Sequence, residues 1–199
     1  RQADVIKTLA ISKATYYRYL DQAVATLQNV LLEQLGPSLR LESPMPKPMV
    51  GRDAARADCA QALQAGQVLA LIGASGLGKS QLGAHLAAAW PARPAFWYTF
   101  RPGLTDNVPA LLFALAYFLY QRGAANLWTQ LIADPRNVSA DKAMAIIRRS
   151  FEELAHAPPL LCFDEADSLL PDELQDSEAH AQARALLEDL AQSNRHGAP

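Results

Sequence analysis

Short apolar runs alternate with stretches of helical periodicity along most of the chain. Three continuous runs, bounded by glycine, proline or acidic residues, are typical of buried parallel strands. The strands are predicted at residues 68–72, 96–100 and 160–163. Apolar positions spaced by three and four predict helices at residues 53–65, 81–90, 108–122, 140–155 (capped by Ser139) and 179–193. Because strands alternate with helices, we predict an α/β fold with a parallel sheet.

A separate helical segment precedes this pattern. Residues 2–35 carry two apolar stripes at helical spacing, divided by a short turn at residues 10–12, and Ser12 can cap the second helix. Residues 36–48 contain four prolines and are typical of an extended linker. We therefore predict a small all-α segment over residues 1–35, a linker over 36–48 and the α/β domain over 49–199.

Composition limits the partners and the cellular compartment that we expect for the protein. The net charge of −2 is too small to indicate a nucleic-acid or membrane surface by itself. The two cysteines, Cys59 and Cys162, are too few for a disulfide framework and lack zinc-ligand spacing, which favours reduced thiols and the cytoplasm. The longest apolar run, residues 108–120, is too short to span a bilayer, so we expect no membrane partner.

A glycine-rich loop joins the first predicted strand to the next helix. Residues 73–80, the glycine loop, read Gly-Ala-Ser-Gly-Leu-Gly-Lys-Ser. Phosphate groups need converging main-chain N–H groups, and glycines allow the loop to supply them. Lys79 would place a positive charge near the β and γ phosphates, and the hydroxyl of Ser80 would bind Mg²⁺. The loop therefore predicts a site for ATP or ADP with Mg²⁺.

Two acids end the third predicted strand. Asp164 and Glu165 follow residues 160–163, at the carboxyl edge where ligands of open α/β sheets bind. We predict that Asp164 holds Mg²⁺ through a water and that Glu165 orients or deprotonates the water that attacks the γ phosphate. Glu165 and Lys79 are thus the predicted catalytic residues, and Ser80 and Asp164 the metal ligands. A solvated acidic turn is the alternative.

The loop, the acidic strand end and a Val-Gly-Arg segment at residues 50–52 together resemble the STAND class of signal-transduction ATPases, relatives of AAA+ proteins with NB-ARC and NACHT modules. The resemblance covers about residues 49–199. It implies a three-layer P-loop fold of the ASCE type and an ATP/ADP switch that opens, and often forms homo-oligomers, with ATP. The implied nucleotide-binding residues are Val50, Gly51, Arg52, Gly73, Ala74, Ser75, Gly76, Leu77, Gly78, Lys79, Ser80 and Gln81.

In the sheet of such a fold, the strand that follows the acidic pair lies between residues 68–72 and 160–163. No segment of the chain up to Pro199 supplies it. We therefore expect the natural protein to continue beyond residue 199, with the sensor strand and C-terminal domains of the family in that part.

Residues 10–20 resemble the turn and recognition helix of helix-turn-helix proteins such as resolvases and invertases. In that pattern Ile11, Tyr16 and Leu20 are buried. The predicted contacts to the DNA groove and phosphates are Ser12, Lys13, Thr15, Tyr17 and Arg18. Residues 1–20 hold four basic side chains against one acid, which favours DNA. The alternative is a helical hairpin that docks on protein.

Three functional hypotheses follow. The first is an ATP-dependent switch of a bacterial, signal-responsive, DNA-binding regulator. The second is an AAA+-like ATPase that assembles on DNA in transposition or phage defence. In the third, the N-terminal helices are a protein-interaction adaptor of the ATPase.

Overall fold

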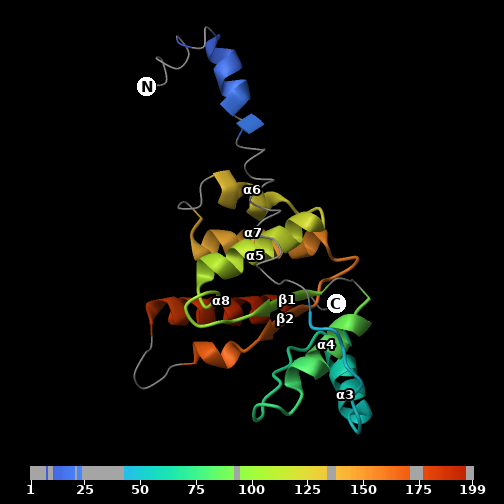
Figure 1. The fold of residues 1–199 in the computed structure, drawn as a ribbon. Coiled ribbons are helices and arrows are strands. Elements are labelled where there is room, and N and C mark those ends of the chain that lie inside the picture. Colours follow the sequence, from blue (N-terminus) through green and yellow to red (C-terminus); the bar gives the residue numbers. More distant parts are fainter. Residues whose placement is uncertain are drawn as a thin grey trace. The chain divides into compact units, whose positions relative to one another are not determined.

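The computed structural model of the chain describes residues 8, 11–20, 22–23, 43–91, 95–133, 138–170 and 177–195 (Figure 1). It forms two compact units, Arg1–Arg40 and Leu41–Pro199.

In the first unit, residues 13–20 are helical. Ser12 caps this helix as predicted, since its Oγ accepts a hydrogen bond of 3.1 Å from the N–H of Thr15. Lys13, Tyr17 and Arg18 lie on the exposed part of the helix. The predicted burial of Leu20 is wrong for the described residues, because its side chain, at the end of the helical residues 13–20, is 44% exposed. The remainder of the predicted segment lies outside the described residues.

The second unit holds most of the described helices and both described strands. In chain order they are α3 (Asp53–Gln64), α4 (Lys79–Ala89), β1 (Phe96–Thr99), α5 (Val108–Gln121), α6 (Asn126–Ala133), α7 (Ala140–Glu153), β2 (Leu161–Asp164), the short 3-10 helix η3 (Ala166–Leu169) and α8 (Glu178–Arg195).

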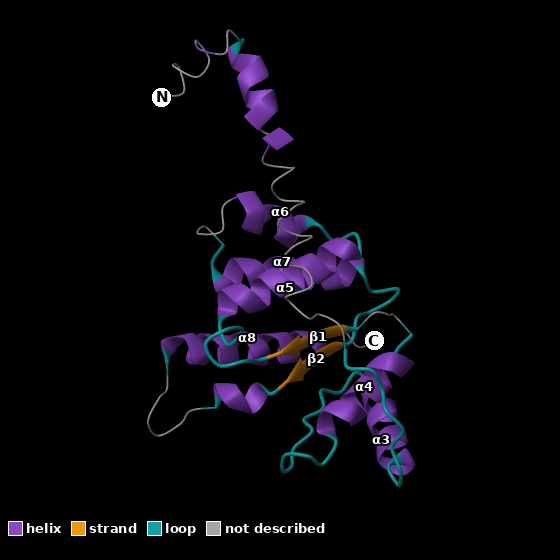
Figure 2. Cartoon of the chain, viewed as in Figure 1, coloured by secondary structure: helices purple, strands orange, loops and turns teal. Residues whose placement is uncertain are grey.

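β1 and β2 pair in parallel, with Phe96 opposite Leu161 and Thr99 opposite Asp164. Both strands therefore end at the same edge of the sheet. Figure 2 shows this strand pair, in orange, among helices of the same unit.

Side chains of β1 alternate between two helical layers. On one face, the ring of Phe96 lies 5.3 Å from that of Phe118 in α5. On the other face, Trp97 packs with Ala84 of α4 in a buried cluster. Gly83 permits this close approach, because a Cβ there would lie 3.1 Å from the Trp97 ring. The unit is thus a mixed fold of helices and a small parallel sheet, in keeping with the predicted α/β class.

The strand predicted at residues 68–72 is wrong in this structure. These residues have no strand assignment, and the side chains of Val68 and Ile72 are 45% and 91% exposed. A strand is defined by main-chain hydrogen bonds to a neighbour, and the only described strand pair is β1 with β2. An apolar run without a neighbouring strand stays irregular.

The other predicted elements of the second unit are confirmed to within about two residues at each end. The side chain of Ser139 caps α7 by accepting from the N–H of Lys142 at 3.3 Å. Helices α6 and η3 were not predicted. No helix within the described ranges combines the length and the apolar character needed to cross a membrane.

Candidate nucleotide site

The glycine loop runs from the end of residues 68–72 into the first turn of α4. Gly78 precedes the helix with a φ of 84°, in the left-handed region that favours glycine. Among the described residues, no hydrogen-bond acceptor is found for the main-chain N–H groups of Gly76, Gly78, Lys79 and Ser80. Unpaired N–H groups at the start of a helix attract anions.

Lys79 folds back over this loop. Its Nζ donates hydrogen bonds to the carbonyl oxygens of Gly73 at 2.8 Å and Ala74 at 3.1 Å. The ammonium group therefore lies inside the curve of the loop, where it adds positive charge to the unpaired N–H groups.

Ser80 connects the loop to the sheet. Its Oγ donates a hydrogen bond of 2.9 Å to Oδ1 of Asp164, a residue 84 positions later in the chain. Asp164 is the last residue of β2, and its Oδ1 also accepts from the N–H of Glu165 at 3.2 Å. A hydroxyl and a carboxylate at this distance are the oxygen donors that Mg²⁺ prefers.

Glu165 has an unusual backbone. Its φ of 55° is the only positive value found for a residue other than glycine in the described part of the chain. Such a conformation costs about 1 to 3 kcal/mol and clusters at functional sites. Its carbonyl accepts from the Oγ of Ser168 at 2.7 Å, and its side chain is exposed. The strained turn holds the carboxyl group in solvent beside Asp164.

The residues of the Val-Gly-Arg segment differ in whether they contact the glycine loop. Arg52 donates a long hydrogen bond of 3.4 Å to the carbonyl oxygen of Leu77 in the glycine loop. Val50, by contrast, is 95% exposed. Thus the structure brings Arg52 to the loop and leaves Val50 in solvent.

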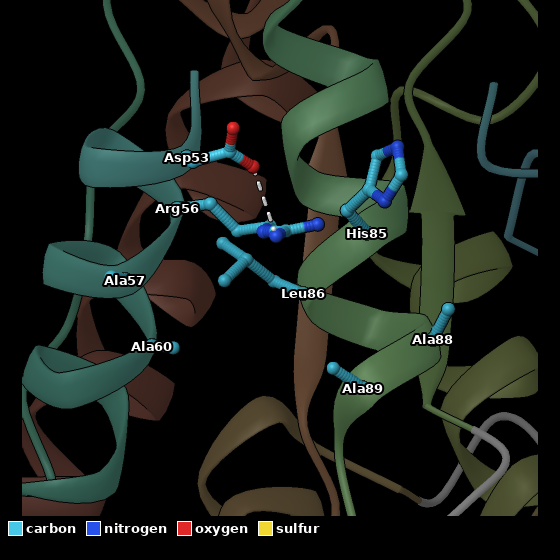
Figure 3. A pocket seen from close by; sticks show the side chains of 8 residues that line it. All are labelled: Asp53, Arg56, Ala57, Ala60, His85, Leu86, Ala88 and Ala89. Atoms are coloured by element: carbon cyan, nitrogen blue, oxygen red, sulfur yellow. Dashed lines mark hydrogen bonds and ion pairs between the residues drawn. The ribbon is translucent and has the colours of Figure 1, made fainter. Parts of the chain in front are cut away.

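A pocket of about 380 Å³ lies between α3 and α4, away from the glycine loop (Figure 3). Its walls are largely apolar, formed by Ala57 and Ala60 of α3 and by Leu86 and Ala89 of α4. The ion pair of Asp53 and Arg56, 3.0 Å long, and the ring of His85 also line it. Sequence patterns did not indicate this pocket.

The side chains of β2 are partly buried, and the strand ends in the carboxylate of Asp164. Burial, and to a smaller extent the charge of Asp164, raise the pKa of the Cys162 thiol to about 12. Within the described ranges, no group of three or more His, Cys, Asp or Glu side chains forms a metal cluster. A magnesium ion here would thus depend on Ser80, Asp164 and oxygens of a ligand.

Two polar clusters near the sheet and the loop were not predicted. In the first, Lys47 is held by side chains of Gln81 and His85. In the second, Nε2 of His180 lies 3.0 Å from Oδ2 of Asp106. No local sequence signal identifies the partners of His85 and His180.

Comparisons of the chain with protein families, with curated proteins and with solved structures gave no match.

Proposed function

We propose that residues 49–199 belong to a P-loop nucleotide-binding domain of the α/β class. More specifically, we propose an ATP-dependent switch resembling STAND ATPases, in a signal-responsive regulator. The observation that carries this proposal is the hydrogen bond between Ser80 and Asp164, because it joins the two motifs that would share one magnesium ion.

The side chains of Lys79 and Ser80 have internal partners that nucleotide and metal would replace. Lys79 would exchange the carbonyls of Gly73 and Ala74 for phosphate oxygens. Ser80 would exchange Asp164 for the metal, and the unpaired loop N–H groups would donate to phosphate. When bound, Mg²⁺ would neutralise phosphate charge. Asp164 would remain close by, and the exposed carboxylate of Glu165 would accept a proton from water.

The exposed apolar segment at residues 68–72 fits the same proposal. In a P-loop sheet, this segment lies beside a strand inserted between it and the acidic strand end. Its exposure at Val68 and Ile72 is what such a strand would cover.

Nucleotide titration of the wild type and Lys79→Ala, followed by calorimetry with ATP and Mg²⁺, tests the site. We expect Lys79→Ala to weaken ATP affinity at least about tenfold, since a charge-assisted contact to phosphate is lost. Lys142→Ala removes an exposed lysine on α7 and serves as the matched control. Equal ATP affinity of the wild type and Lys79→Ala contradicts the proposal.

Glu165 is tested separately. In a chain that turns ATP over, Glu165→Gln should retain nucleotide affinity and slow phosphate release by a factor of about 10² or more, because water activation is lost. An unchanged rate removes Glu165 from this role.

A DNA-binding role for the first unit is favoured by Lys13 and Arg18, which lie exposed on a helix that Ser12 caps. Tyr19 and Leu20, 53% and 44% exposed, instead favour a protein partner. Titrating the whole chain with duplex DNA across salt concentrations separates the two. Binding that weakens with salt and is lost in the Lys13→Ala, Arg18→Ala double variant supports DNA. The absence of salt-sensitive binding supports the adaptor.

Sequence-independent loading on DNA that requires ATP would support the second hypothesis, an ATPase of transposition or phage defence.

A further inference from the structure

The segment that leads into α3 is attached to α4 through the backbone of Lys47. The N–H of Lys47 donates a hydrogen bond of 2.8 Å to Oε1 of Gln81. The carbonyl oxygen of the same residue lies 2.7 Å from Nε2 of His85. Because a carbonyl only accepts, His85 carries a proton on Nε2. Both main-chain groups of one residue are thus held by side chains of one helix.

The sequence favours this arrangement on both sides. Gln81 and His85 are four positions apart, so they lie on one face of α4. Pro48 restricts the preceding Lys47 to extended backbone, and Pro46 and Pro48 have no N–H. Lys47 therefore has the one main-chain N–H between Met45 and Met49, and the extended backbone directs this N–H toward the helix.

Two further observations place the residues after Lys47 near the glycine loop. The methyl carbon of Met49 lies 3.9 Å from the position that a Cβ on Gly78 would occupy. Arg52 donates to the carbonyl oxygen of Leu77. Residues 47–52, which we name the strap, therefore follow α4 back from its second turn to the loop.

We propose that the strap is a regulatory element of the nucleotide site, so that nucleotide binding tightens it and its release weakens nucleotide binding. This inference rests on the proposed function. Gln81 directly follows Ser80, and Leu77 precedes Gly78 and Lys79, so the strap is anchored on residues that bound phosphate would order. By linkage, the factor by which nucleotide stabilises the strap equals the factor by which the strap stabilises bound nucleotide.

The strap also lies on the chain path between Arg1–Arg40 and α3. Its six residues, once released, can span at most about 20 Å. Nucleotide occupancy would therefore change the length of free chain that tethers the first unit.

Hydrogen exchange of the whole chain, read by mass spectrometry on a peptide covering residues 43–49, tests the attachment without nucleotide. Gln81→Ala should accelerate exchange at Lys47 about two- to tenfold, the effect of one exposed hydrogen bond. Gln81→Glu retains the acceptor oxygen and should retain the protection. Gln61→Ala, on the exposed surface of α3, is the control. Exchange as slow in Gln81→Ala as in the wild type overturns the attachment.

The coupling is tested at His85, which is not among the proposed nucleotide ligands. We expect ATP with Mg²⁺ to slow exchange at Lys47, and His85→Ala to weaken ATP affinity about two- to tenfold. His85→Gln keeps a nitrogen donor, so it should restore both the ATP affinity and the ATP-dependent slowing of exchange at Lys47. His156→Ala should change neither the affinity nor the exchange. ATP binding that leaves exchange at Lys47 unchanged overturns the coupling alone. A wild type that binds no ATP overturns the proposed function and the coupling together, whereas the attachment is still measured without nucleotide.

Discussion

The two helices α5 and α3 show how differently the halves of the second unit are held together. In α5, the apolar side chains from Leu111 to Leu119 include seven buried residues, whereas α3 has none in the described structure. Ile147 in α7 is fully buried, and Ile72 before the glycine loop is 91% exposed. Apolar burial stabilises the half with β1, β2 and α5 to α8.

In the half that carries the glycine loop, α4 packs on Trp97 through buried alanines, whereas α3 and residues 68–72 add little burial and the loop itself is held by a few polar contacts. Ser80 reaches Asp164, Lys79 reaches the loop carbonyls, and Gln81 and His85 hold Lys47. Regions with little apolar burial open locally at low free energy. Such a region can be reordered by a ligand without unfolding the packed half, which suits a switch.

Each half of the second unit contains one cysteine. The difference in thiol reactivity between them is the largest effect that we expect. Raising the thiol pKa of Cys162 from 9.0 to about 12 lowers its thiolate fraction about a thousandfold at pH 8. We expect iodoacetamide to modify Cys162 in β2 at least about tenfold more slowly than an ordinary thiol, since the thiolate is the reactive form, as followed by peptide mass spectrometry. Cys59 of α3 is the internal comparison. Equal rates at both cysteines would mean that β2 is not packed as described.

Isoleucine truncation compares the same halves by stability. Ile147→Ala should lower the free energy of unfolding by about 2 to 5 kcal/mol, because it removes buried methylenes and leaves a cavity. Ile72→Ala should change it by less than about 0.5 kcal/mol, since the side chain is already in water. Urea denaturation measures both. A loss at Ile72 as large as at Ile147 would show that another strand covers residues 68–72 in solution.

The same contrast explains which elements the sequence could predict. Residues 68–72 and 160–163 have similar apolar runs, yet only the second forms a strand, because β1 lies beside it. A strand needs a neighbour that its own residues do not encode. Helix α6 escaped prediction because its eight residues are too few to show a clear period, although Leu127 and Trp128 are buried.

Some contacts of the candidate site were likewise predictable from the sequence, and others were not. The glycine loop is a local motif, and the carboxyl-edge rule brought Asp164 to Ser80 across 84 residues. The partner of Gln81 and His85 comes from an irregular segment, for which no periodicity applies. The position of Asp164 at the carboxyl edge was thus predictable, whereas the contact with Lys47 is seen only in the structure.

A polar pair in the packed half gives an intermediate effect that depends on pH. Burial alone would raise the pKa of the Asp106 carboxyl. Hydrogen bonds from His180 and the N–H of Gly103, together with the charge of His180, outweigh it and lower the pKa below 3.8. A carboxyl with a lowered folded-state pKa stabilises the fold above its unfolded pKa. This stabilisation is lost as pH falls through the folded value.

Asp106→Asn should therefore destabilise the protein by about 1 to 3 kcal/mol at pH 5 to 7, and the difference from the wild type should shrink below about pH 4. Denaturant unfolding across this range measures it. Asp58→Asn, on the exposed surface of α3, is the control and should have little effect at either pH. A difference that stays constant down to pH 2 contradicts the assigned pKa direction.

Helix caps provide the smallest and most local comparison. Ser139 caps α7 with its side chain, whereas Arg52 at the start of α3 makes no side-chain cap hydrogen bond. Ser139→Ala should cost about 1 kcal/mol, because the N–H of Lys142 loses its acceptor. Arg52→Ala should cost less than about 0.5 kcal/mol, since its exposed contact to Leu77 contributes little. Thermal unfolding separates the two. If Arg52→Ala proves as costly as Ser139→Ala, the strap stabilises the fold itself, and the half that carries the glycine loop is more tightly held than its exposure indicates.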